Sequence, residues 1–158
     1  MRLVDFMSEK LVIAGLSGTT RDDALKEIVA CIVAVRDDIN ADRALSVLTE
    51  REKLGSTGVG QGLAIPHARL SNLDRTVACF ARSTEGVAFA ARDGKPTHLL
   101  FTILAPDGKA SSHLKALARA SRLFRDPAFR QELLAAGGSA EIYRLIDEQD
   151  RRLGSDGT

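Results

Sequence analysis

The sequence predicts a single domain of the α/β class. Residues 97–104 are nearly all apolar or β-branched, which is typical of a central strand covered on both faces by helices. Segments with helical spacing of apolar residues occur both before and after this strand. A length of 158 residues and a hydrophobic content of 44% fit one compact domain with a real core.

The first elements are a short strand or extended lead-in at residues 11–13 and a helix that begins after Thr20. The Thr20 hydroxyl and Asp23, three residues on, form a pair similar to a capping box. Apolar residues then recur along one face, which we assign to the core: Leu25, Ile28, Val29, Ile32 and Val35.

Asn40 is expected to cap a second helix, which ends before Gly55. Arg51 then lies on the last helical turn. A cation is favoured there by the helix dipole. Arg51 therefore fits a solvated helix end, and only its nearness to the glycine-rich segment that follows argues for a further role.

Two further segments, residues 76–81 and 97–104, are rich in β-branched and aromatic residues and are predicted to be strands. A short strand at residues 86–90 can precede the turn at residues 93–94. His98 opens the central strand, where we expect it to be structural.

The last part of the chain is expected to be helical. Ser111 or Ser112 is predicted to cap one helix, and Asp126 followed by Pro127 starts the next. This second helix should stop at residues 137–138, and Ser139 should cap the final one. We place the domain at residues 1–150 and expect residues 151–158 to form a flexible tail.

Composition excludes several function classes. The formal net charge is +1, so there is no global signature of nucleic-acid binding. No apolar run approaches the roughly 20 residues that a membrane span needs, and residues 1–16 lack the apolar core of a signal peptide. We therefore expect a cytoplasmic protein without membrane insertion.

The sequence predicts neither a metal site nor an organic cofactor. Cys31 and Cys79 lie far apart in apolar segments, which suits reduced core thiols better than a metal or redox motif. No HExxH, CxxC, EF-hand or GxSxG motif is present. Glycines at 58, 60 and 62 suggest a dinucleotide fingerprint, but the required strand-before-helix order is reversed.

More residues suited to ligand binding or catalysis gather at residues 51–69, REKLGSTGVGQGLAIPHAR, than in any other segment. Four glycines between Gly55 and Gly62 allow unusual backbone conformations and exposed N–H groups. Pro66 stiffens the approach to His67. Arg51 upstream and Arg69 downstream add positive charge.

The hydroxyls of Ser56 and Thr57 are candidate hydrogen-bond donors to an anionic group held at His67. The N–H groups of the loop around Gly58 are candidate donors to the same group. A phosphoryl group fits this set of donors. A glycine-rich turn followed by a surface histidine without function fits the same residues.

Residues 54–70, LGSTGVGQGLAIPHARL, resemble the phosphorylation-site motif of the enzyme IIA proteins of the fructose and mannitol class, which belong to the bacterial phosphoenolpyruvate-dependent phosphotransferase system. Within this class, the resemblance is greatest to the nitrogen-regulatory enzyme IIA and extends over residues 3–146. It implies a central mixed β-sheet flanked by helices. It also implies that His67 accepts the phosphoryl group, with Arg51 and a second histidine, His113, beside it. The residue after the histidine is usually glycine in this class and is Ala68 here.

The implied donor is a phosphohistidine on a small carrier protein, and no cofactor is needed. Within the class, two roles remain open. One is a regulator whose partners depend on phosphorylation of His67, and the other is a sugar-uptake component that passes phosphate to a separate IIB protein. Because no IIB-like segment follows residue 146 and no membrane span is evident, we expect the regulatory role.

Overall fold

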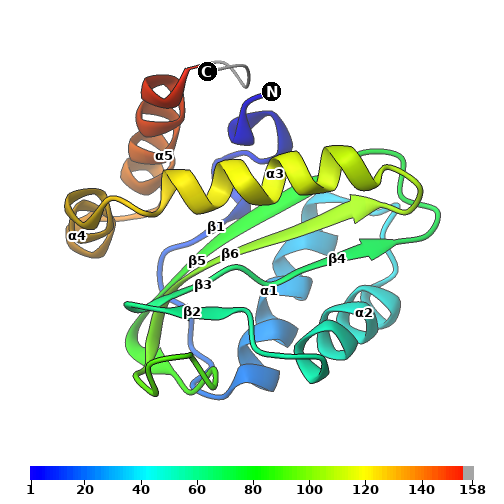
Figure 1. Cartoon of the computed structure of the whole chain (residues 1–158), viewed down its shortest axis with the longest axis horizontal. Helices are drawn as coiled ribbons and strands as arrows, with labels where there is room; N and C mark the ends of the chain where they lie inside the picture. Colours follow the sequence, from blue (N-terminus) through cyan, green and yellow to red (C-terminus); the bar gives the residue numbers. More distant parts are fainter. Residues whose placement is uncertain (155–158) are drawn as a thin grey trace.

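The computed structural model of the chain, which describes residues 1–154, has a central mixed sheet covered by helices on both faces (Figure 1). The core of this sheet is β6 (Thr97–Pro106), which lies between β5 (Val77–Val87) and the short strands β3 (Leu63–Ala64) and β4 (His67–Leu70). β5 runs antiparallel to β6, whereas β3 and β4 run parallel to it. β1 (Val12–Ile13) and β2 (Gly58–Gly60) form the outer edges. The predicted fold class is confirmed.

Helices α1 (Arg21–Val35) and α2 (Ala41–Lys53) pack together on one side of the sheet. Helix α3 (Ala110–Leu123) crosses the opposite face, and α4 (Pro127–Ala135) and α5 (Ser139–Leu153) follow at its end (Figure 1). Two 3-10 turns, Leu3–Phe6 and Glu9–Leu11, precede β1. Among the described residues, no helix is both long and apolar enough to cross a membrane.

Three helix starts are predicted correctly from the local sequence. Thr20 accepts a hydrogen bond from the Asp23 N–H, Asn40 accepts one from the Arg43 N–H, and Asp126 caps α4. The other two predicted caps are wrong. Ser111 and Ser112 lie inside the first turn of α3, because the chain leaves β6 through a tight turn that fixes the helix start at Ala110.

The final helix begins directly at Ser139, which is therefore not its cap. Instead, the carboxylate of Glu141 reaches back and accepts the N–H of Gly137. The start of the predicted tail is wrong as well, since α5 continues to Leu153. Asp150, fully buried, forms an ion pair of 2.8 Å with Arg119 and so anchors the last turns. Residues 155–158 of the predicted tail lie outside the described residues.

The predicted strand at residues 76–81 is the first half of a longer one, because β5 continues through an irregular pairing to Val87. The suggested short strand at 86–90 is the end of β5 together with an isolated bridge between Thr20 and Ala88. His98 is structural, as expected, and its Nδ1 lies 2.8 Å from the carbonyl oxygen of Ser83.

Candidate functional site

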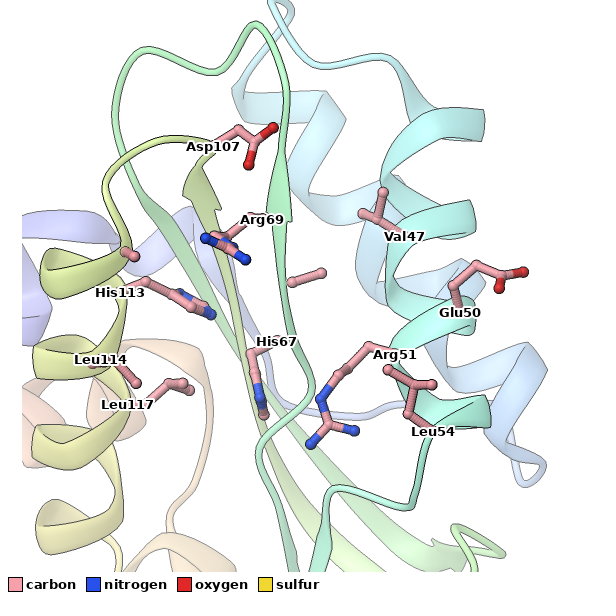
Figure 2. A pocket seen from close by; sticks show the side chains of 12 residues that line it. Val47, Glu50, Arg51, Leu54, His67, Arg69, Asp107, His113, Leu114 and Leu117 are labelled. Carbon is pink, nitrogen blue, oxygen red and sulfur yellow. The ribbon is translucent and has the colours of Figure 1, made fainter.

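His67 is the first residue of β4 and lies in the floor of a cleft between α2 and α3 (Figure 2). Parallel pairing with β6 fixes the backbone there: His67 pairs with Ile103, and the N–H of Ile103 donates to the carbonyl of Pro66. This pairing holds the backbone at His67 in place, in agreement with the stiffening expected from Pro66. The cleft has a volume of about 720 Å³.

The Nδ1 atom of His67 lies 2.7 Å from the carbonyl oxygen of Ile65. A carbonyl oxygen can only accept a hydrogen bond, so in the neutral ring Nδ1 carries the proton and donates it. The remaining ring nitrogen, Nε2, then carries the lone pair. The local backbone therefore leaves Nε2 as the ring nitrogen that is free to bind a ligand.

Burial lowers the pKa of His67 below its usual value, and the positive charge of Arg51 acts in the same direction. The hydrogen bond to Ile65 and the negative charge of Glu52 oppose this shift. A lowered pKa means that the ring stays neutral to lower pH than a free imidazole. The neutral form of the His67 ring is consequently favoured over the imidazolium more than in a free imidazole at the same pH.

Arg51 and His113 approach His67 from opposite walls of the cleft. Arg51 lies on the last turn of α2, and its Nη1 donates to the carbonyl of Gly55 at 2.9 Å. His113 lies in the first turn of α3, and its ring centroid is 5.6 Å from that of His67, with the ring planes tilted by 50°. The structure thus brings together two groups that are 62 residues apart in the numbering.

His113 is buried, and none of the described residues hydrogen-bonds its Nδ1. Burial lowers the pKa of His113, and the nearby His67 and Arg69 lower it further. Arg69 follows His67 by two residues on the same strand and therefore projects from the same face. Figure 2 shows its side chain in the cleft, on the side of His113.

The predicted hydroxyl donors point elsewhere. The Ser56 hydroxyl donates to the carbonyl of Phe89 at 2.7 Å, and the Thr57 hydroxyl donates to the carboxylate of Glu52. Neither residue lines the cleft. Both hydroxyls serve to hold the glycine-rich loop rather than to face a ligand of His67.

Gly58 has a structural role in the same loop. Its N–H donates to the Ser56 hydroxyl oxygen at 3.0 Å, so that group has a partner. A Cβ atom at Gly58 would come within 3.0 Å of the Ala91 backbone. Close packing against the neighbouring loop is therefore the reason for a glycine here.

Glu52 is a positioning residue that the sequence did not single out. Its side chain is buried at the end of α2, and it accepts the Thr57 N–H at 3.0 Å in addition to the Thr57 hydroxyl. This carboxylate joins the helix that carries Arg51 to the loop that leads to His67. In the sequence, the only sign of this contact is that Thr57, a residue with a hydroxyl group, follows Glu52 closely.

Ala68 fits the strand without strain. It pairs with Leu104 in the β4–β6 ladder and does not adopt a positive φ. The glycine usual at this place in the enzyme IIA class is thus not required by the backbone of this chain.

The cleft also contains two acidic side chains and an apolar rim. Glu50 comes from α2 and Asp107 from the turn after β6, while Leu54 and Leu114 face each other across the opening (Figure 2). These leucines are 86% and 66% exposed. In the described part of the chain, no group of three or more histidine, cysteine or acidic side chains is placed to hold a metal ion.

We predict that the pKa of His67, followed by NMR of its ring Cε1–H, lies below the ordinary value of about 6.5. Arg51→Gln removes a cation that disfavours the imidazolium, so the midpoint should rise in this variant. The His67 resonance is assigned by its loss in His67→Gln. A wild-type midpoint at or above the free-imidazole value, or no upward change in Arg51→Gln, would contradict this electrostatic description.

Comparison with known proteins gives consistent relatives. The family described as "Phosphoenolpyruvate-dependent sugar phosphotransferase system, EIIA 2" matches residues 5–149. A nitrogen regulatory protein of Bradyrhizobium diazoefficiens is 36% identical over 146 residues, covering 92% of this chain and 95% of the relative. A fructose-specific EIIA component of Haloferax volcanii is 36% identical over 129 residues, covering 82% and 84%.

The fold comparison agrees with these sequence matches. The crystal structure of nitrogen regulatory protein IIA-Ntr from Neisseria meningitidis superimposes with a TM-score of 0.84 at 27% identity, covering 90% of this chain and 97% of that one. The family match covers nearly the whole described domain, including both walls of the cleft. This protein therefore belongs to the EIIA 2 family of the phosphoenolpyruvate-dependent sugar phosphotransferase system and is a phosphotransferase of that system.

Proposed function

We propose that Nε2 of His67 accepts a phosphoryl group from a phosphohistidine on a small carrier protein, and that the phosphorylation state of His67 regulates other proteins. The observation that carries this proposal is the hydrogen bond from Nδ1 to the Ile65 carbonyl, which leaves Nε2 unprotonated in an open cleft. Family membership supplies the reaction class.

The transfer is an in-line displacement. A phosphorus–nitrogen bond forms at Nε2 of His67 while the phosphorus–nitrogen bond to the carrier's histidine breaks, and the lone pair returns to that leaving imidazole. Charge on the three transferring oxygens is met by Arg51 from one wall and by Arg69 from the other side. The unpaired Nδ1 of His113 provides a further polar atom at this end of the cleft.

The rim of the cleft is suited to a protein donor. Leu54 and Leu114 are large apolar residues, mostly exposed, and they flank the opening that leads to His67. An apolar rim around a charged centre matches the usual anatomy of a protein interface, in which apolar contacts provide the area and polar groups the orientation. The rim therefore suits a carrier protein better than a small phosphate donor.

Regulation is the favoured outcome of this transfer because two relatives, matched at 36% and 27% identity over 95% and 97% of their length, are nitrogen regulatory proteins. Phosphorylation would add about 1.5 to 2 negative charges at one point of the surface. A partner with an acidic or dry surface over His67 would then be repelled, whereas a basic surface would be attracted. The second candidate is sugar uptake with a separate IIB protein, favoured by the fructose-specific relative.

The test combines partner capture with label transfer. Wild type, His67→Ala and the phosphate mimic His67→Glu are used as baits in extracts of the source cell, and bound proteins are identified by mass spectrometry. We expect different partner sets for the two variants. Wild type labelled at His67 should keep its label when mixed with sugar-specific IIB proteins.

Identical partner sets together with rapid passage of label to a IIB protein would replace regulation with sugar uptake and leave the acceptor role of His67 intact. Failure of wild type to take up any label from the carrier would remove the acceptor role itself.

A further inference from the structure

Cys31 and Cys79 are close in space, although they are far apart in the sequence. Cys31 lies in α1 between the fully buried Ile28 and Ile32, and its Sγ donates to the carbonyl of Lys10 at 3.4 Å. Lys10 lies in the 3-10 turn Glu9–Leu11 just before β1, which pairs in parallel with β5, the strand of Cys79. The Cys31 thiol is thus directed at the β1–β5 edge.

The Sγ atom of Cys79 lies 3.9 Å from the carbonyl oxygen of Phe80, the residue that pairs with Val12 of β1, so both thiols lie at the β1–β5 edge. Cys79 is fully buried, whereas Cys31 is partly exposed, so the expectation that both are core thiols holds for Cys79 only. Both are free in the reduced protein. The pair lies outside the cleft of His67, and the phosphotransfer chemistry has no use for it.

We propose that Cys31 and Cys79 form an oxidative modification site that reacts with hydroperoxides and closes to an intramolecular disulfide. The Cys31 thiolate attacks one peroxide oxygen, the O–O bond breaks, and the released hydroxide takes a proton to become water. Sγ of Cys79 then attacks the resulting sulfenic acid, and its proton leaves with the hydroxyl group as a second water. Two thiols lose two electrons in all, and hydrogen peroxide is reduced to two waters.

The environments of the two cysteines suit these separate roles. Interaction with the Cys79 thiol lowers the pKa of Cys31 to about 7, although burial acts in the opposite direction. The same interaction and burial raise the pKa of Cys79 well above its ordinary value. Cys31 is therefore the accessible thiolate that meets the oxidant, and Cys79 is the protonated, enclosed thiol that resolves it.

The disulfide would tie α1 to the central sheet. The loop that it closes contains α2, the glycine-rich segment and β4, and hence both Arg51 and His67. Closing a loop restricts the unfolded chain and favours the folded state, provided that the bond forms without strain. Oxidation should therefore stabilise the part of the chain that carries the phosphotransfer site.

The experiment treats reduced full-length wild type, Cys31→Ser and Cys79→Ala with one equivalent of hydrogen peroxide, followed by denaturation and alkylation with N-ethylmaleimide. We expect wild type to lose both alkylatable thiols and two hydrogen atoms of mass while remaining monomeric, and dithiothreitol to restore both thiols. The Tm of the oxidised wild type should rise. Cys79→Ala should stop at a sulfenic acid that dimedone traps, and Cys31→Ser should keep its thiol.

Because Cys31 is only partly buried, Cys31→Ser should fold, and the wild-type and Cys31→Ser results together test the proposal. Retention of two alkylatable thiols in wild type, disulfides only between chains, or equally fast oxidation of Cys31→Ser would each overturn the proposal. Both cysteines lie outside the cleft, so labelling of His67 remains an independent measurement.

Discussion

Replacing His67 with glutamine is expected to abolish labelling of this protein by the phosphohistidine carrier. Glutamine keeps a polar side chain of similar reach but offers no ring nitrogen to form the phosphorus–nitrogen bond. Wild type should gain one acid-labile phosphoryl group when incubated with phosphoenolpyruvate, enzyme I and the carrier. Intact-mass measurement at alkaline pH, where phosphohistidine survives, is the readout.

The matched control is His98→Gln. His98 also lies in the sheet and also places its Nδ1 next to a carbonyl oxygen, that of Ser83, but it does not line the cleft. It should be labelled as the wild type is, provided that circular dichroism shows a folded protein. Labelling of His67→Gln at the wild-type level would place the acceptor elsewhere in the chain.

The second large effect is expected for Arg51→Gln. Arg51 lines the cleft on the opposite side of His67 from His113, and its charge already influences the pKa of His67. Loss of one preorganised donor that meets charge in a transition state typically costs about 10² to 10³ in rate. The single-turnover transfer rate should fall by this order, with the fold retained.

Lys53→Gln provides the control for charge at the same helix end. Lys53 follows Arg51 by two residues, forms an exposed ion pair with Glu50, and lies outside the cleft. Its removal changes the net charge as Arg51→Gln does, but it should leave the rate close to that of the wild type. Equal rates for all three proteins would exclude Arg51 from charge stabilisation, and equal losses in both variants would indicate general steering of the donor instead.

The relatives of this chain include both a nitrogen regulatory protein and a fructose-specific EIIA component. In the proposed mechanism the cleft would serve either role, because acceptance of a phosphoryl group at His67 would require the same nucleophile and the same cations in both. The difference lies in the protein that reads the phosphorylated state. Partner capture with the His67 variants addresses that difference directly.

Features that follow from local chemistry can be predicted from the sequence alone. Thr20, Asn40 and Asp126 cap their helices because the donor and acceptor lie within three residues of each other. The apolar run at residues 97–104 had to be central, since both of its faces need cover. The glycine-rich loop and the proline before His67 marked the candidate site.

Which groups share the cleft depends on the packing of elements that are distant in the sequence. His113 and Arg69 meet near His67 because α3 packs over β6 at the point where β4 joins the sheet. The hydroxyls of Ser56 and Thr57 satisfy a backbone carbonyl and a buried carboxylate instead. Which acceptor a hydroxyl group binds depends on how the whole chain folds. The local sequence pattern therefore cannot predict it.

The same reason explains the end of the chain. Residues 151 and 152 are polar and are predicted to belong to a tail. The helix α5 nevertheless continues through them, because Asp150, directly before them, forms a buried ion pair with Arg119. Burial of a charge is tolerated only when a partner of opposite charge is positioned to meet it. That partner lies 31 residues earlier, on a different helix, and only the packing of α3 against α5 brings the two together.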